Sequence, residues 1–470
     1  MTASDVIGRF PLCRDLAART LRVGEGEYTL IYFENLCDRR FIHEYILFPL
    51  TTAAPSTLPE QAITCGALSY PADEDEAVKL LLTGEALVVG EGRAISVKVQ
   101  SELSRAVGEP ETETVIRGPR EGFTERAGNN AALLRRRIRS PHLKYEVLTL
   151  GRTGATMTVL MYLDDRVNRP ALASLRRRLA EIDADAVLDS GQLELWLEGR
   201  LCPLFSTVGN SERPDKVAAK LLEGRVAIIV DGTPVVLTVP YLFIESLQST
   251  EDYGKSLLYA TFIRTLRLAA LGLSVLLPAL FLALLLYHPE AIPASLLKTV
   301  AEARESVPFS PFVELLVVLL AFEMIREVAI RMPRSVGSAV SLVAALILGD
   351  SAISAGITSA PVIIVVAFTA IGSFLVPPYM NTVILLRLLF LVAARLAGLY
   401  GIAMLSSGVL IALCATESFT VPYLSPLAPF APSALTDVLT VLPPWQMRRL
   451  PGELVGAVRR RNRTKREEMP

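Results

Sequence analysis

The stretch that decides the fold is residues 311–356, which read PFVELLVVLLAFEMIREVAIRMPRSVGSAVSLVAALILGDSAISAG. It begins as an apolar helix pattern, and five charged residues lie in it before Pro333: Glu314, Glu323, Arg326, Glu327 and Arg331. A charged side chain within a membrane helix needs a partner from protein or water. In a helix Glu323 and Arg326 are i,i+3 neighbours and Glu327 and Arg331 are i,i+4 neighbours, so the charges can pair along one stripe. The pattern predicts a membrane helix with a charged seam, which either holds helices together or lines an ion path.

The composition indicates a membrane protein with a large soluble part. The chain has 470 residues, 51% of them hydrophobic, and its 47 basic residues nearly balance 48 acidic ones. Residues 268–287 and 351–386 are uncharged runs long enough to cross a bilayer, whereas the sequence before about residue 255 has an ordinary α/β pattern. We therefore predict a multidomain membrane protein, with two tandem α/β cytosolic subdomains followed by an α-helical transmembrane domain.

The sequence shows no motif of a catalytic, cofactor or metal site. The five cysteines form no CxxC pair, and the three histidines are His43, His142 and His288. A Walker A loop and a GxSxG motif are absent, so we expect no enzyme activity, no cofactor and no metal. The balanced charge argues against nucleic-acid binding. The first 20 residues hold three arginines and no apolar core, so we expect no signal peptide and a soluble part in the cytosol.

The soluble part contains a weak internal repeat. Residues 76–92, EAVKLLLTGEALVVGEG, can be overlaid on residues 216–232, KVAAKLLEGRVAIIVDG, and Gly84 then falls on Gly224. Each copy predicts a helix that ends at the glycine, followed by a hairpin with a tight glycine turn. The repeat indicates two domains of similar topology, and the alternative is generic α/β patterning.

Between the copies lies a strongly basic connector, residues 115–141, with seven arginines and two glutamates. The arginines 135–137 are sequential and fan around a helix, so they do not form one face. We expect a solvated clasp between domains rather than a core element, and the alternative is a contact with carboxylates of a neighbouring copy. The candidate subunit or interdomain contacts are Arg117, Arg120, Glu121, Arg135, Arg136, Glu212, Arg213 and Asp215.

Several longer motifs occur in a fixed order along the chain: residues 120–144 (REGFTERAGNNAALLRRRIRSPHLK), 183–190 (DADAVLDS), 211–216 (SERPDK), 322–333 (FEMIREVAIRMP) and 359–374 (SAPVIIVVAFTAIGSF). Together they resemble the A-subunit family of bacterial spore germinant receptors, the GerA family, from about residue 20 to 450. Two departures are Ser211, where threonine is usual, and Gly349-Asp350, where glycine-glutamine is common. The second departure is similar to the related stage V sporulation protein AF branch.

The resemblance implies a membrane subunit of a spore nutrient-germinant receptor in the spore inner membrane. It also implies a homo-oligomer, proposed to be a pentamer, that forms a ligand-gated cation channel and triggers germination. The implied partners are a transporter-like B subunit, a C-subunit lipoprotein and membrane lipid. The alternative is a stage V sporulation AF-like channel or scaffold subunit, which amplifies germination without sensing nutrient. A secondary transporter would show internal symmetry among its spans, and none is visible here.

Basic residues on both sides of the hydrophobic part place both termini in the cytosol, so the number of spans should be even, four or six. Eight arginines and lysines lie in residues 448–466. The candidate spans are residues 268–287, 312–330, 336–348, 361–376, 383–396 and 397–415. The predicted domains are 1–118 (first cytosolic subdomain), 119–141 (basic connector), 142–248 (second cytosolic subdomain), 249–420 (transmembrane) and 421–470 (proline-rich, then basic cytosolic tail).

A pore lining is predicted within residues 335–356, the membrane stretch that combines serines and glycines with a single acid. Val343 and Leu346 would hold ions back by dewetting, and Asp350 at the outer end would favour cations. The alternatives are that Asp350 caps the helix begun at Ser351, and that the small residues serve helix packing. The candidate lining residues are Ser338, Val343, Leu346, Asp350 and Ser354.

Overall fold

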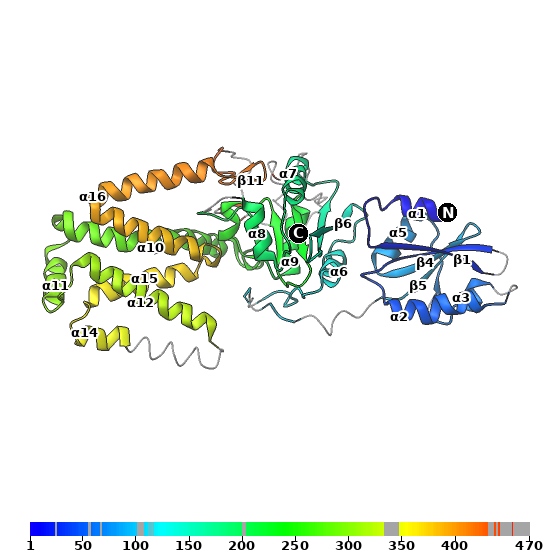
Figure 1. Cartoon of the computed structure of the whole chain (residues 1–470), viewed down its shortest axis with the longest axis horizontal. Helices are drawn as coiled ribbons and strands as arrows, with labels where there is room; N and C mark the ends of the chain where they lie inside the picture. Colours follow the sequence, from blue (N-terminus) through cyan, green and yellow to red (C-terminus); the bar gives the residue numbers. More distant parts are fainter. Residues whose placement is uncertain are drawn as a thin grey trace, which may run out of the picture. The chain divides into compact units, whose positions relative to one another are not determined.

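The structure, a computed structural model, has two compact units, a sheet unit and a helical unit (Figure 1). The sheet unit comprises residues 1–241, 417–423 and 443–470, and the helical unit comprises residues 242–416 and 424–442. The structure describes residues 1–23, 26–54, 58–65, 68–100, 108–110, 112, 113, 115, 117–199, 204–332, 347–430, 437, 438, 440, 441 and 454.

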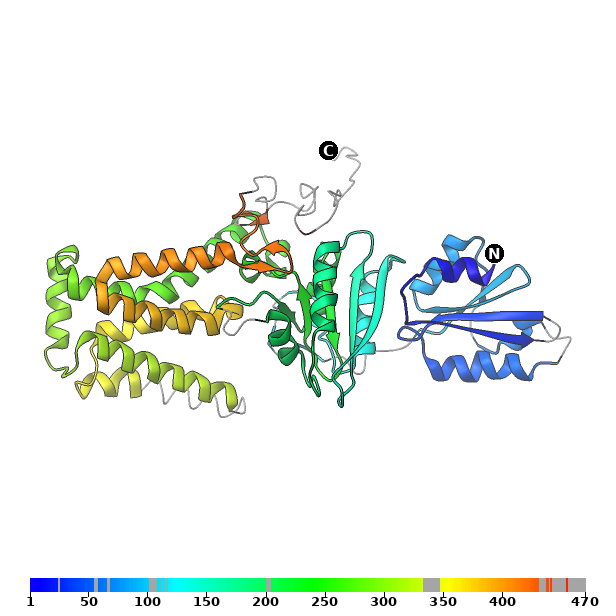
Figure 2. The same ribbon diagram turned by 45° about the horizontal axis from the view of Figure 1, so that its top comes forward.

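The first sheet is antiparallel, with the strand order β1-β2-β4-β5-β3. Helices α1 and α5 cover one face and α2 and α3 cover the other (Figures 1 and 2). The glycine turns fit this arrangement, because Gly84 ends α5 with a φ of +90° and Gly92 closes the β4–β5 hairpin with a φ of +76°. The elements are α1 (Ala3–Gly8), β1 (Leu16–Val23), β2 (Gly26–Phe33), α2 (Arg39–Ile42), the π-helical η1 (His43–Leu47), α3 (Phe48–Thr52), α4 (Pro59–Ala62), β3 (Leu68–Ser69), α5 (Glu74–Leu82), β4 (Glu85–Gly90) and β5 (Arg93–Lys98).

The second sheet repeats this topology, with the order β6-β7-β9-β10-β8. Its strands alternate between two apolar cores: Leu160 and Ile228 pack with α7 and α8, whereas Val159 and Ile229 pack with α6 and α9. The tandem repeat predicted from sequence therefore corresponds to two sheets of the same topology. The elements are α6 (Ala127–Arg137), β6 (Leu143–Leu150), β7 (Thr156–Leu163), α7 (Arg169–Ala180), α8 (Ser190–Glu198), β8 (Gly209–Ser211), α9 (Pro214–Leu222), β9 (Val226–Val230) and β10 (Val236–Val239).

The expectation that the basic connector, residues 115–141, is solvated is wrong for helix α6. Ala131 and Leu134 of this helix are 1% and 0% exposed, and they belong to the core that covers one face of the second sheet. The arginines obscured this pattern, because the alanines and leucines between them supply the buried face. At least residues 127–137 are therefore part of the second sheet's core.

A second correction concerns residues 417–423, which the predicted boundaries assign to the transmembrane domain and the tail. Residues 417–423 belong to the sheet unit, where β11 (Glu417–Ser418) and β12 (Val421–Pro422) form a small hairpin. Phe419 is 0% exposed and packs in the core between the second sheet and helices α7 and α8. Ser418 donates a hydrogen bond to the Thr207 carbonyl at 2.7 Å and accepts one from the Tyr241 amide at 2.9 Å. Residues 421–423 therefore belong to the sheet unit and not to the predicted tail, residues 421–470.

The helical unit contains two described helices that are long and apolar enough to cross a membrane, Leu257–Tyr287 and Pro377–Ala415. The second bends sharply at Ala397–Gly398 and doubles back, which Figures 1 and 2 show for α16. Gly398 has a φ of +57°, and a Cβ there would lie 3.0 Å from the Tyr287 ring, so glycine is required at this turn. The elements are η3 (Phe243–Leu247), η4 (Thr250–Gly254), α10 (Leu257–Tyr287), η5 (Pro289–Ala291), α11 (Ala294–Arg304), α12 (Pro311–Arg331), the π-helical η6 (Ile347–Ser351), α14 (Ala352–Ser354), α15 (Ala360–Phe374), η7 (Pro377–Tyr379) and α16 (Met380–Ala415).

These elements confirm the predicted fold class at the level the structure resolves. Two antiparallel sheet subdomains with flanking helices precede a helical region that contains two apolar candidate spans.

Candidate functional site

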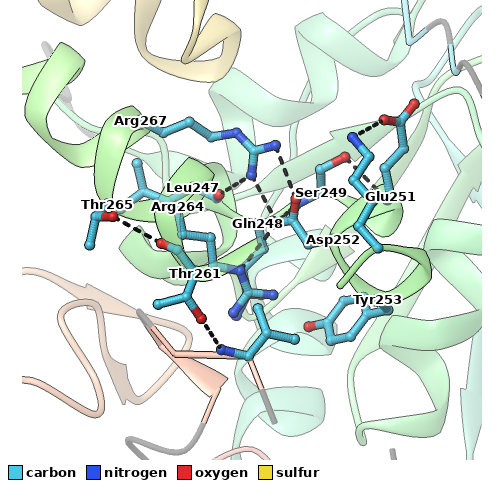
Figure 3. A network of polar contacts seen from close by, with 12 residues as sticks. Leu247, Gln248, Ser249, Glu251, Asp252, Tyr253, Thr261, Arg264, Thr265 and Arg267 are labelled. Atoms are coloured by element: carbon cyan, nitrogen blue, oxygen red, sulfur yellow. Dashed lines mark hydrogen bonds and ion pairs between the residues drawn. The ribbon is translucent and has the colours of Figure 1, made fainter. Parts of the chain in front are cut away.

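A buried polar network surrounds the start of α10, and we call it the Asp252 network. The carboxylate of Asp252, on the 3-10 helix η4, accepts hydrogen bonds from both terminal nitrogens of Arg267 at 2.8 and 3.1 Å and from Nε of Arg264 at 3.1 Å. Figure 3 shows both arginines, one helical turn apart on α10, directed at this carboxylate. Because the spacing is i,i+3, the two guanidiniums lie on the same face of the helix. The paired charges can therefore fix η4 against the start of α10.

The same network holds Asp437, which lies 173 residues after Arg264 in the sequence. Arg264 Nη1 donates to the Asp437 carboxylate and to its backbone carbonyl, each at 2.9 Å. The Tyr253 hydroxyl donates to the same carboxylate at 2.7 Å, and the Gln248 amide donates to the Asp437 carbonyl at 2.7 Å. The Arg264 guanidinium also stacks on the Tyr253 ring, 5.3 Å from its centroid.

The charges of the Asp252 network balance, since Arg264 and Arg267 face Asp252 and Asp437. Burial alone would raise the pKa of Asp252, but the hydrogen bonds from Arg267 and from the Ser249 amide outweigh it and hold that pKa below its usual value. Asp252 is therefore ionised at neutral pH. Since Arg264 and Asp252 are 0% and 1% exposed, removing one partner would leave a charge buried alone, which costs about 3 to 5 kcal/mol.

A second cluster forms around Glu314, in the first turn of α12. One oxygen of this 1% exposed residue accepts from the Ser359 amide at 2.7 Å and from the Ser359 and Thr358 hydroxyls at 2.6 and 3.2 Å. The other oxygen accepts from Arg304 Nε at 3.0 Å. Because Ser359 precedes α15, Glu314 supplies the carboxylate at the N-terminus of that helix. This cluster ties α11, α12 and α15 together.

A third cluster lies around Glu323 of α12. Its carboxylate lies 2.7 Å from Arg326 on the same helix and 3.1 Å from Arg387 on α16. Arg387 is 2% exposed, and its Nε donates to the Ser274 carbonyl of α10 at 2.9 Å. The cluster therefore connects three helices of the bundle.

The five charged residues of the predicted seam thus lie in three separate places. Glu314 belongs with Arg304, and Glu323 and Arg326 belong with Arg387. Glu327 and Arg331 pair with each other at 2.6 Å at the end of α12, with side chains 55% and 77% exposed. The two predicted pairs within α12 therefore form, while Glu314 and Glu323 also bind residues of other helices, so the charges do not make a single stripe.

Among the arginines of the basic segment, Arg135 makes the contact between the two sheet subdomains. Its Nε and Nη2 donate to the two Asp15 oxygens at 2.8 and 3.0 Å, and both side chains are 1% exposed. The guanidinium also covers the Phe33 ring at 4.3 Å. Asp15 directly precedes β1 of the first sheet, whereas α6 packs on the second sheet. A buried bidentate ion pair therefore joins the two subdomains.

The remaining residues of that candidate set pair with residues between positions 109 and 215, are half-buried or lie at the surface. Arg213 binds Asp215 through two nitrogens at 3.0 and 2.5 Å, and the Glu212 carboxylate accepts from the Thr112 amide at 3.1 Å. Arg120 lies 3.5 Å from Glu109, Glu121 pairs with Arg137 at 2.5 Å, Arg136 is half-buried and Arg117 is exposed.

Three of the candidate pore residues, Ser338, Val343 and Leu346, lie outside the described residues. Asp350 lies in η6 and Ser354 in α14, and both are exposed. The reading of Asp350 as a helix cap is wrong, because it lies within a helical turn and the N-cap position of α14 belongs to Ser351.

Sequence reasoning did not identify Asp15, Arg304, Arg387 or Asp437 as site residues. A signal existed for Arg387, which is the one charged residue between Asp350 and Arg395. Within the part of the chain that the structure describes, no group of three or more histidine, cysteine or acidic side chains could hold a metal ion.

Comparison with known proteins covers both units of the chain. The family model described as Bacillus/Clostridium GerA spore germination protein matches residues 5–452. "Spore germination protein KA" of Bacillus subtilis (strain 168) is 39% identical over 445 residues, which is 92% of this chain and 82% of that protein. "Uncharacterized membrane protein YfkQ" of the same organism is 34% identical, over 94% of this chain and 88% of that protein.

A solved structure, the N-terminal domain of the A subunit of the Bacillus megaterium spore germinant receptor GerK3, is similar with 30% identity and a TM-score of 0.41. It covers 51% of this chain and 93% of its own. The family match runs through the sheets, the Asp252 network and the charged clusters of the helical unit, and it includes 448 of the 470 residues, since 452 − 5 + 1 = 448. The chain therefore belongs to the GerA family of spore germination proteins.

Proposed function

We propose that this chain is the A subunit of a spore nutrient-germinant receptor, and that copies of it assemble into a ligand-gated cation channel. The observation that carries the proposal is the family match over residues 5–452, which spans the sheet unit and the helical unit together. We further propose that the assembly is a homo-oligomer, a pentamer, in the spore inner membrane, with both termini on the cytosolic side.

The Asp252 network is suited to transmit a signal to the membrane helices. It lies directly before the apolar part of α10, so any displacement of η4 must move Arg264 and Arg267 or break their ion pairs. A buried, charge-balanced network has few intermediate arrangements, because a half-broken one leaves a charge without a partner. Movement of η4 would therefore be passed to α10 as a discrete step rather than absorbed.

We propose that the pore is lined by the stretch that includes Ser338, Val343, Leu346, Asp350 and Ser354. Asp350 and Ser354 are exposed in a single copy, so they remain available to face a shared axis. A ring of aspartates would attract cations, and an apolar constriction would close the path by dewetting.

We propose that the channel works with a transporter-like B subunit that senses the nutrient and with a C-subunit lipoprotein. We propose 1–118 as the first cytosolic subdomain, and we extend the second beyond 142–248 to include residues 127–137 and 417–423, because Ala131 and Phe419 are buried in its cores. The membrane domain that we propose is the helical unit.

A stage V sporulation AF-like subunit is the second candidate, and Gly349-Asp350 is the observation that favours it. Such a subunit would amplify germination without sensing nutrient. The two candidates differ in whether deletion abolishes the response to one nutrient or slows the response to all of them.

The test is a deletion strain together with reconstitution of the purified chain in liposomes. We expect the deletion to abolish germination with a single class of nutrient, and the reconstituted oligomer to release cations. Asp350→Asn should lower cation selectivity while the oligomer remains intact. An oligomer with no conductance, alone or with its partner subunits, would refute the channel.

A further inference from the structure

The end of α12 near Arg331 and the part of α16 packed on it hold an unequal number of charges. Among the described residues there, two acids face three bases, which are Glu323 and Glu327 against Arg326, Arg331 and Arg387. The Glu323 cluster alone has one carboxylate between two guanidiniums, so it carries a surplus positive charge.

This surplus is largely shielded from solvent. Arg387 is 2% exposed, and the side chains of Glu323 and Arg326 are partly buried at 16% and 13% exposed. Among the residues that the structure describes, Nη2 of Arg387 and Nε of Arg326 have no hydrogen-bond partner. An uncompensated charge in such surroundings is strongly unfavourable. The cluster therefore requires an anion that a single copy, as described, does not supply.

Depth within the helices identifies the kind of anion. Arg387 binds the carbonyl of Ser274, seven residues after Arg267 on α10, which places the cluster about 10 Å beyond the last charged residue at the start of that helix. A lipid phosphate stays at the membrane surface, whereas a carboxylate on a neighbouring membrane helix can reach this depth. The anion is therefore best supplied by protein.

Glu327 lies at the required depth, and its present partner Arg331 can bind another anion instead. It follows Arg326 directly, so the two residues differ by about 1.5 Å along the helix axis. Its side chain is 55% exposed, and its partner Arg331, the last residue of α12, is 77% exposed and can extend to lipid phosphates. Glu327 can thus be released without leaving Arg331 unpaired.

We propose that Glu327 of one copy binds Arg326 of the next copy, and that this ion pair neutralises the surplus charge of the Glu323 cluster. Successive residues of a helix point about 100° apart, so Glu327 and Arg326 lie on different faces. Each copy then uses one face toward each neighbour, which is the heterologous contact that closes a ring. The exposed apolar residues beside Glu327 on α12 suit such a contact: Val317, Leu320, Met324 and Val328, which are 41 to 70% exposed.

The inference rests on the proposed homo-oligomer, and a mixing experiment with the full-length chain tests it. Arg326→Glu and Glu327→Arg are made separately, carry different affinity tags, and are expressed alone or together. In an oligomer of either variant alone, residues 326 and 327 of neighbouring copies carry like charges. Where a copy of one variant lies next to a copy of the other, these two residues carry opposite charges again. The measurement is the oligomer-to-monomer ratio of the purified protein in detergent, with tandem purification for mixed species.

We expect each variant alone to lower that ratio roughly tenfold or more, the scale of a close interfacial charge pair, and co-expression to restore mixed oligomers. The matched control is Lys298→Gln, since Lys298 forms an exposed pair with Glu302 on α11 and should leave the ratio unchanged. Melting of the monomer fraction reports whether each variant folds. As a second control, a variant that only unfolds cannot be rescued by mixing.

Two results would overturn the inference: either variant alone assembles like the unaltered chain, or co-expressed variants assemble no better than each alone. An unaltered chain that is monomeric throughout would instead refute the proposed homo-oligomer. The two failures are therefore distinguishable.

Discussion

Replacing Phe419 by alanine should destabilise the sheet unit far more than its position in the sequence suggests. Phe419 is 0% exposed and packs among the leucines of α7 in the core of the second sheet. Its ring also receives the Arg178 guanidinium at 4.5 Å from the centroid. Truncation removes both contacts and leaves a cavity that the surrounding sheet and helices can fill only in part.

The magnitude follows from these contacts. A buried phenylalanine truncated to alanine costs about 3 to 5 kcal/mol, and loss of the cation–π contact adds about 0.5 to 2 kcal/mol. The two terms share atoms, so we take about 4 kcal/mol in total. For a unit of this size 1 kcal/mol corresponds to about 2 to 4 °C, so the melting temperature of the sheet unit should fall by about 8 to 16 °C.

The assay is thermal unfolding of the full-length chain in detergent, followed by proteolysis of the sheet unit. Phe48→Ala is the matched control, because Phe48 lies in the same unit and is 60% exposed. A fragment of residues 1–248, which lacks Phe419, should be destabilised to a similar extent. A Phe419→Ala chain that melts within about 2 °C of the unaltered one would refute this account of the core.

Three further predictions concern the buried charges. Arg135→Met should cost about 3 to 5 kcal/mol by leaving Asp15 buried alone, and Asp15→Leu combined with it should restore most of the loss in a thermal melt. Glu314→Gln should lower the stability of the helical unit by about 2 to 3 kcal/mol, measured by protease protection, whereas Glu302→Gln at an exposed pair should not. Because the folded pKa of Asp252 is lowered from 3.8, its stabilisation is present above about pH 4 and lost as the pH falls through the folded value. Asp252→Asn should remove that part of the acid sensitivity in melts from pH 7 to 3.

The sequence predicts the repeated helix-and-hairpin units well, because Gly84 and Gly224 occupy equivalent left-handed positions and carry a strong local signal. It does not reveal β1, whose sequence LAARTLRV contains two arginines and no clear alternation. As an edge strand β1 needs fewer apolar residues than a central strand, so its pattern is weak.

The charged sites can also be predicted only in part from the sequence. Spacing along one helix predicts the Glu323–Arg326 pair, because both residues lie within a single turn. The contacts of Arg264 with Asp437 and of Arg135 with Asp15 join residues 173 and 120 positions apart, and no local pattern encodes them. A single arginine within a long apolar run, such as Arg387, is a signal in the sequence. Its partner Glu323 can be identified only once α12 and α16 are packed together.

The buried position of Phe419 also constrains how the protein is made. The ribosome completes Tyr241, the last residue before the helical unit, 178 residues before it adds Phe419, since 419 − 241 = 178. At about 5 to 20 residues per second this interval lasts roughly 10 to 35 s. During that time the second sheet lacks one of its core side chains, while the helical unit is being synthesised. A chain whose synthesis stops before residue 419 would therefore keep part of that apolar core open to solvent.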